Sequence, residues 1–261
     1  MTVATAASER FDIGRVFSGG FEIVGRRPLT MIVLTAIFAY LPGVATLWLT
    51  THALPPPKPG VGLAAVGPAL GRLGGVEVIA VVVGGLGWIL HGAVAAAALS
   101  DYGERPLGVG EALARAAPRM PLVYVLGLLA SIAIAVGTVL LIVPGILLAL
   151  AWSVGGIVAT VENTGFKSFG RSAELTRGNR ISIFIIFIVY AIAGMIVSFA
   201  VRAVSGAALT PLAPPLWLTF VQPLASAVVQ AFSVATMVAA YVELRGVKEG
   251  LAAPSLASLF D

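Results

Sequence analysis

Six long apolar runs follow one another along the chain, and shorter polar segments separate them. None of the runs alternates apolar and polar residues in the ten-residue pattern of membrane strands. About 20 apolar residues in a helix, rising 1.5 Å per residue, cross the roughly 30 Å hydrocarbon core of a bilayer. The pattern therefore predicts an all-α polytopic membrane protein with six transmembrane helices. The expected spans are 28–50, 76–100, 121–143, 146–161, 181–201 and 217–241.

Three of the polar segments are amphipathic, because their apolar residues recur at helical spacing. In the last of them, Phe166 and Phe169 share one face, and Lys167 and Arg171 share the other. Such segments are typical of interfacial helices that lie on a membrane surface. The first has an alternative, an N-terminal helix packed on the bundle. Each precedes a pair of spans, which suggests three repeats of a surface helix followed by a hairpin. The three segments are 11–27, 107–119 and 164–177.

Proline and glycine mark the expected interruptions. Pro42-Gly43 predicts a kink within the first span, since an internal proline removes a helical hydrogen bond. Pro144-Gly145 predicts the turn between the third and fourth spans, unless the short fourth span draws both residues into its helix. We therefore expect a single membrane domain over residues 1–261. Three segments are predicted to lie outside its bundle, namely the loops 51–75 and 202–216 and a mobile tail from Gly246.

Composition and charge support this class and orient it. Hydrophobic residues make up 59% and charged residues 11%, against roughly 45–50% and about 25% in soluble domains. Thirteen of the 16 Lys and Arg residues fall in the N-terminal segment, the tail and the connections 101–120 and 162–180. The positive-inside rule then places both termini in the cytoplasm. Basic residues at span ends point to anionic phospholipid as the partner, and not to nucleic acid.

Two acidic residues close spans on this predicted cytoplasmic side. Glu162 follows the fourth span and Glu243 follows the sixth. Arginines lie close to them in sequence, at Arg171, Arg180 and Arg245. Carboxylates at such an interface are stabilised by guanidinium partners. The sequence thus predicts an ion-pair cluster, which is either a static clamp on the surface helix or a site for a headgroup or another anion.

Three further polar residues lie inside predicted spans, where polar groups are costly. His91 is either a neutral histidine hydrogen-bonded to a neighbouring helix or a group with a proton or ligand role. Gln222 and Gln230 lie two turns apart on the sixth span, and we expect them to hydrogen-bond between helices.

Several kinds of chemistry are missing from the sequence. The chain has no cysteine and two histidines, which excludes thiolate sites and a multi-histidine metal site. It has no phosphate-binding loop and no nucleophile elbow. We therefore expect no enzymatic activity, no cofactor and no metal.

Stretches at both ends and in the middle of the chain resemble a known bacterial membrane family. LIVPGILLALAWS, followed by Glu162 and by GFKSFGRSAELTRGNR, is similar to its core signature. FDIGRVFSGGFEIVGRR and YVELRGVKEG match its usual start and finish. The family contains the membrane domain fused to some glycerophosphoryl diester phosphodiesterases and also stand-alone inner-membrane proteins. The resemblance implies six helices in the bacterial inner membrane. It implies no activity here, because the phosphodiesterase domain is absent, and it identifies no catalytic or ligand residue.

Three functional hypotheses remain. The leading one is a non-enzymatic integral membrane protein that organises or binds lipid or partner proteins. The second is a small-solute transporter or channel. A cavity beside His91 that opens to one face of the membrane would support it. The third is a membrane-bound enzyme of lipid metabolism, which needs a polar pocket at the level of Glu162 and Arg171.

Overall fold

The computed structural model describes residues 10–53, 66–100, 109–205 and 215–250, and these residues form helices and turns. Six helical runs are long and apolar enough to cross a membrane, which confirms the predicted all-α, six-span class. These runs are Pro28–His52, Gly74–Leu99, Ala117–Leu140, Ile142–Val161, Arg180–Val204 and Leu218–Glu249. Residues 54–65 and 206–214 of the two predicted loops, the connection 101–108 and the end of the predicted tail lie outside the described residues. The prediction of a loop over 51–75 was wrong for its described part, because 51–53 end a π-helical segment and 66–75 begin the long helix of the second span.

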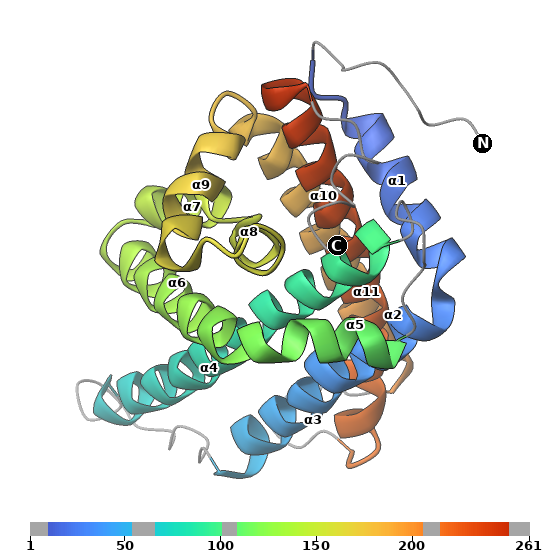
Figure 1. Cartoon of the computed structure of the whole chain (residues 1–261). Helices are drawn as coiled ribbons and strands as arrows, with labels where there is room; N and C mark the ends of the chain where they lie inside the picture. Colours follow the sequence, from blue (N-terminus) through green and yellow to red (C-terminus); the bar gives the residue numbers. More distant parts are fainter. Residues whose placement is uncertain (1–9, 54–65, 101–108, 206–214, 251–261) are drawn as a thin grey trace.

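The described residues contain eleven α-helices. They are α1 (Ile13–Arg26), α2 (Pro28–Thr35), α3 (Leu41–Trp48), α4 (Val66–Leu99), α5 (Val109–Ala116), α6 (Met120–Leu140), α7 (Ile142–Ala151), α8 (Gly155–Val161), α9 (Ser168–Thr176), α10 (Arg180–Val204) and α11 (Leu218–Glu249). Of these helices, α1, α5 and α9 lie outside the six spans. Figure 1 shows α4 and α6 side by side, with α11 and α10 across the bundle from α6.

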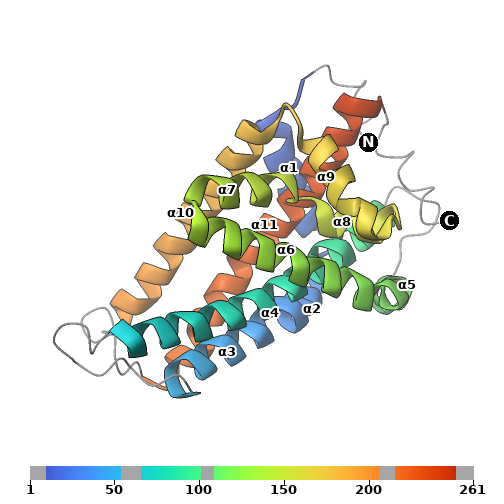
Figure 2. The ribbon, with the colours of Figure 1, turned by 90° about the vertical axis from the view of Figure 1, so that its left-hand side faces the viewer.

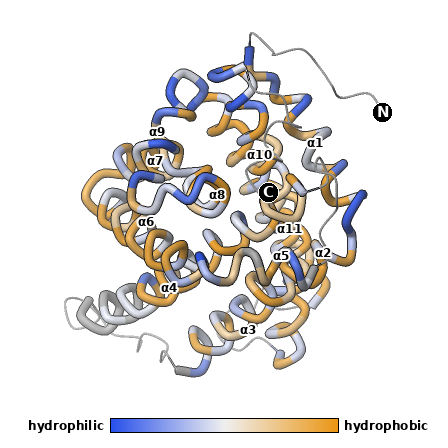
Figure 3. The backbone as a smooth tube through the Cα atoms, in the orientation of Figure 1, coloured by the Kyte–Doolittle hydropathy of each residue, from blue (hydrophilic) through white to orange (hydrophobic). Residues whose placement is uncertain are grey.

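One end of the bundle is polar and the middle is apolar. The short helices α5 and α9 and the C-terminal end of α11 lie at the same end, opposite the start of α4 and the end of α3 (Figure 2). Hydrophilic residues concentrate on α9 and its neighbours, whereas the long helices are mostly hydrophobic (Figure 3). We call the polar end the arginine-rich end. It is defined by Arg119, Arg171, Arg177, Arg180 and Arg245.

The first span contains a wider helical turn just before its proline. Residues Ala36–Tyr40 form a π-helical segment, and the amide of Leu41 donates to the carbonyl of Ala36. Pro42 follows as the second residue of α3. A proline has no amide hydrogen and crowds the preceding turn, and π-helical turns commonly accommodate such defects. The predicted interruption at Pro42 thus takes the form of this π segment.

The turn between the third and fourth spans lies earlier than predicted. Leu141 alone is extended, with φ −155° and ψ 123°, and Pro144 is the third residue of α7. The first turn of a helix tolerates proline because its amides have no helical partner. Pro144-Gly145 therefore belongs to the helix, as the alternative allowed. A Cβ on Gly145 would lie 2.7 Å from the amide nitrogen of Thr138, so the glycine permits a tight hairpin.

The helix α11 forms the centre of the core and carries α1 along its side. Val234, Ala235 and Val238 of α11 are fully buried. A Cβ on Gly20 of α1 would lie 2.8 Å from the Cα of Thr236, so this glycine lets the two helices touch. The first amphipathic segment thus packs on the bundle. Its equivalence with α5 and α9 as a repeat stays a prediction.

The sixth span continues beyond the predicted start of the tail. Helix α11 ends at Glu249, and Gly250 follows with φ +66°. Glycine reaches this left-handed conformation at little cost and is the usual residue after a helix. The prediction of a mobile tail from Gly246 was therefore wrong for its first four residues, which are helical.

Candidate functional site

A closed ring of ion pairs joins α8, α9 and α11 at the arginine-rich end. Glu162 accepts hydrogen bonds from Arg171 Nε at 2.9 Å and from Arg245 Nη1 at 3.2 Å. Glu249 accepts from Arg245 Nε at 2.6 Å and also from Arg171 Nη2. Tyr241 donates to Glu162 at 2.9 Å and accepts from Arg245 at 3.0 Å. We call these five residues the clamp.

Local helical geometry brings the clamp residues together. Tyr241, Arg245 and Glu249 follow one another at intervals of four, which places them on one face of α11. Glu162 caps the C-terminus of α8. The next residue, Asn163, has φ +51°, a left-handed conformation that asparagine tolerates better than most residues. This turn reverses the chain so that α9 lies beside the end of α8.

The clamp is electrically balanced and internally satisfied. Two carboxylates face two guanidinium groups, and all four carboxylate oxygens accept at least one hydrogen bond. Burial opposes the charge of Arg171, but its hydrogen bonds to Glu249 and Glu162 outweigh that effect and raise its pKa above the ordinary value. Since no carboxylate is left over and no cation is unpaired, the geometry favours a structural role over anion binding.

Two predicted members lie outside the clamp. Glu243 accepts from Arg15 Nη2 at 2.7 Å and from the backbone amide of Asp12 at 3.3 Å, which ties α11 to α1. The hydrogen bond to Glu243 raises the pKa of Arg15. Arg180 begins α10, and its Nε is buried without a hydrogen-bond partner among the described residues. The structure therefore brings together three of the five predicted residues.

Sequence reasoning missed Tyr241 and Glu249. Glu249 lies in the segment predicted to be a tail, and Tyr241 lies at the predicted end of the span. The signal that identifies them is their spacing of four residues on either side of Arg245.

Three cations lie at the two ends of α9 and at the start of α10, and none has an acidic partner among the described residues. Lys167 and Arg177 are exposed, and Arg180 is half-buried. None of the three is within 4.0 Å of a carboxylate in the described part of the chain. Large apolar residues are their neighbours in sequence: Phe166 precedes Lys167 and is 62% exposed, and Ile181 follows Arg180 and is 78% exposed. We call these five residues the basic corner.

The intramembrane polar residues occupy separate places. His91 lines a partly enclosed cavity of about 230 Å³ between α4 and the interruption that separates α7 from α8. Gln230 lines a different pocket, between α10 and α11. The Oε1 atom of Gln222 is buried without a hydrogen-bond partner among the described residues. The predicted bonding between helices is therefore absent for this atom of Gln222.

Comparison with known proteins gives one partial match. The chain is 36% identical over 77 residues to a UPF0259 membrane protein of Sodalis glossinidius (strain morsitans). The match covers 29% of this chain and 31% of that protein, so the chain matches about a third of its relative's length. No family model matches the chain. No solved structure matches it either. Together with the six apolar helices, the match supports a multi-pass integral membrane protein.

Proposed function

We propose that this chain is a non-enzymatic integral membrane protein that binds anionic phospholipid at its arginine-rich end. The basic corner carries this proposal. Its cations Lys167, Arg177 and Arg180 have no acidic partner within the described residues, whereas the neighbouring Arg171 and Arg245 are saturated inside the clamp. A Lys or Arg near an anionic membrane surface contributes about 1 kcal/mol of attraction.

The exposed apolar residues of the basic corner support the same conclusion. Phe166 and Ile181 adjoin the cations, and both are more than half exposed. Apolar and basic side chains on one surface are typical of segments at the boundary of headgroups and acyl chains. The corner therefore offers apolar contact to the acyl region and positive charge to a phosphate.

The proposal includes a location. We infer that the arginine-rich end faces the cytoplasm of a bacterial inner membrane, as the distribution of Lys and Arg indicates. The resemblance to the membrane domain of glycerophosphoryl diester phosphodiesterases supports this location. The relative is itself a membrane protein by name.

Lipid binding at the basic corner is testable with one pair of variants. Arg177→Gln removes a cation from the corner, and Arg202→Gln removes one near the opposite end of α10. In native mass spectrometry with phosphatidylglycerol, we expect Arg177→Gln to lower the bound fraction severalfold, as about 1 kcal/mol implies. Arg202→Gln should bind as the wild type does. Equal binding of phosphatidylglycerol and phosphatidylcholine to the wild type would contradict the proposal.

A second candidate function is transport of a small solute. The observation that favours it is the interruption of the fourth span beside the cavity at His91. Interrupted transmembrane helices frequently form substrate sites in transporters. Solute uptake by proteoliposomes that depends on this protein would support transport, and uptake equal to that of empty liposomes would count against it.

A further inference from the structure

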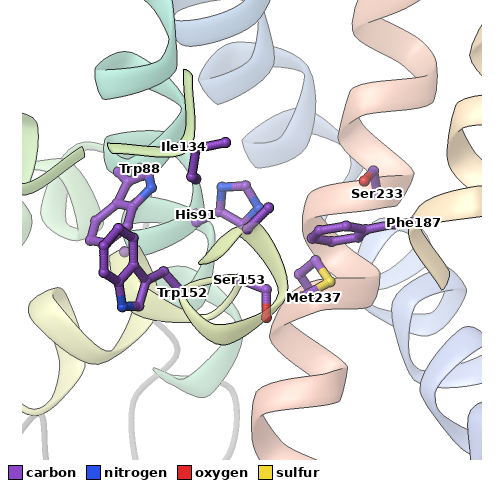
Figure 4. A pocket seen from close by; sticks show the side chains of 10 residues that line it. Trp88, His91, Ile134, Trp152, Ser153, Phe187, Ser233 and Met237 are labelled. Atoms are coloured by element: carbon purple, nitrogen blue, oxygen red, sulfur yellow. The ribbon is translucent and has the colours of Figure 1, made fainter. Parts of the chain in front are cut away.

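Residues of five segments line the cavity at the interrupted fourth span. It lies between α4, α6 and the α7–α8 interruption on one side and α10 and α11 on the other. Figure 4 shows His91 near the middle, with Trp88 and Trp152 on one side and Phe187 and Met237 on the other. All of these residues belong to the six candidate spans. The cavity thus lies within the membrane-spanning part of the bundle.

The walls of the cavity are fixed by packing. The rings of Trp88 and Trp152 both lie against Phe169 of α9, with centroid distances of 5.6 and 4.8 Å. The helix α7 ends at Ala151, whose carbonyl accepts a hydrogen bond from Ser172 of α9 at 2.8 Å. Non-helical backbone within a membrane requires such a partner. Contacts with α9 therefore stabilise the interruption between α7 and α8.

Besides the two indoles, three polar side chains line this space: His91, Ser153 and Ser233. His91 Nδ1 lies 2.8 Å from the carbonyl oxygen of Gly87. A carbonyl only accepts, so Nδ1 carries the proton and Nε2 of a neutral ring is left as an acceptor. The Oγ atom of Ser153 is buried and has no hydrogen-bond partner in the described part of the chain. A buried hydroxyl without a partner costs about 1–3 kcal/mol.

We propose that the cavity binds a neutral, membrane-soluble molecule with a flat ring and a hydroxyl group, of the phenol class. Its hydroxyl donates to His91 Nε2 and accepts from Ser153, and its ring lies between the aromatic walls. Among the described residues, no Asp, Glu, Lys or Arg lines the cavity, and an unpaired charge is expensive in such surroundings. The proposal is independent of lipid binding at the basic corner.

The size of the cavity supports a single substituted ring. A water occupies about 30 Å³ of liquid, so 230 Å³ holds about eight waters. An engineered apolar cavity of about 150 Å³ in another protein binds benzene. The space therefore suits a ring with a few substituents. A purely apolar ligand of this size would leave Ser153 without a partner.

Tryptophan fluorescence in lipid nanodiscs reports on this site directly. The chain has four tryptophans, and Trp48 and Trp217 are exposed at 49% and 47%. In a Trp48→Phe/Trp217→Phe background, emission comes from Trp88 and Trp152 at the cavity. The heavy-atom quencher 4-bromophenol is the probe, and 4-bromoanisole is its counterpart without the hydroxyl donor. We expect saturable quenching at concentrations about tenfold lower for the phenol, the effect of one hydrogen bond.

Variants separate binding in the cavity from partition into lipid. Ala149→Leu places a larger side chain at the cavity wall and should abolish saturable quenching by both probes. Ala200→Leu, at an exposed position of α10, is the matched control and should quench as the background protein does. His91→Phe should bring the two probes within about twofold, because the acceptor is gone. Ser153→Ala should weaken saturable quenching by both probes severalfold, because it removes the hydroxyl that donates to the oxygen of either one. It serves where His91→Phe fails to fold.

Two results would overturn the proposal. One is equal quenching by the phenol and the anisole in the background protein, which would mean that the probes enter the lipid without specific recognition of the hydroxyl group. The other is saturable quenching that persists unchanged in Ala149→Leu, which places the probe elsewhere. An unchanged melting temperature in Ala149→Leu shows that lost quenching does not come from lost folding.

Discussion

Glu162 connects both arginines and the tyrosine of the clamp, so it contacts three of the other four members. Its side chain is 12% exposed, and that of Arg245 is 9% exposed. A buried ion pair contributes little net stability compared with an apolar pair, but removing one partner leaves an uncompensated charge. The clamp therefore fixes the position of α9 more than it adds to the overall free energy of folding.

Glu162→Gln tests this at the residue scale. The substitution keeps the shape but removes the charge that faces Arg171 and Arg245. We expect the free energy of unfolding to fall by about 3 kcal/mol, the lower end for a broken buried pair. Thermal unfolding in detergent provides the measurement.

The control is Glu174→Gln, because Glu174 is 73% exposed and lies 3.8 Å from Arg171. An exposed pair of this kind contributes at most about 1 kcal/mol. Equal melting temperatures for Glu162→Gln and the wild type would show that the clamp does not stabilise the fold.

Helical periodicity explains which clamp residues the sequence could identify. Glu243 and Arg245 are two positions apart, which is about 200° around a helix of 3.6 residues per turn. They therefore face opposite sides of α11, and Glu243 meets Arg15 of α1. Tyr241 lies four positions before Arg245 and therefore shares the same face of α11. Arg171 follows Glu162 by nine positions, and the turn at Asn163 brings the two side chains together. Their short separation in sequence already indicates this proximity.

At the scale of elements, the interrupted fourth span depends on contacts from distant sequence. Apolarity along 142–161 is continuous, so the run predicts one helix. The structure divides it into α7 and α8. Hydroxyls of α9 donate hydrogen bonds to the Ala151 carbonyl and replace the helical amide that would otherwise do so. The cavity beside His91 arises from this division. Neither feature follows from local pattern, since both need the position of α9.

Gly156→Ala tests the packing of α8 on α4. A Cβ on Gly156 would lie 2.6 Å from the carbonyl oxygen of Trp88, a backbone atom that cannot move aside cheaply. Overpacking of this kind costs about 1–3 kcal/mol. We expect a lower melting temperature for Gly156→Ala in detergent.

Gly194→Ala on α10 is the matched control, because its Cβ would meet nothing within 4 Å. It should leave stability unchanged or raise it, since alanine favours helices by about 1 kcal/mol over glycine. A loss equal to that of Gly156→Ala would mean that close packing at Trp88 is not the cause.

At the scale of the whole molecule, six spans and their approximate limits followed from the length and continuity of apolar runs. These properties are local, and the bilayer imposes them on each helix separately. The first and last described helices meet at one end, where Arg15 contacts Glu243 at 2.7 Å. The orientation of that end is a separate proposal, based on the distribution of Lys and Arg.

Cysteine labelling tests that orientation most directly, because the chain contains no cysteine of its own. Gly170→Cys places a thiol on exposed α9 at the arginine-rich end, and Val204→Cys places one at a position 88% exposed at the far end of α10. A membrane-impermeant maleimide is applied to right-side-out spheroplasts and to inverted inner-membrane vesicles. We expect Val204→Cys to react in spheroplasts alone and Gly170→Cys in inverted vesicles alone. Labelling of both positions from the same side would contradict a bundle that crosses the membrane with its arginine-rich end in the cytoplasm.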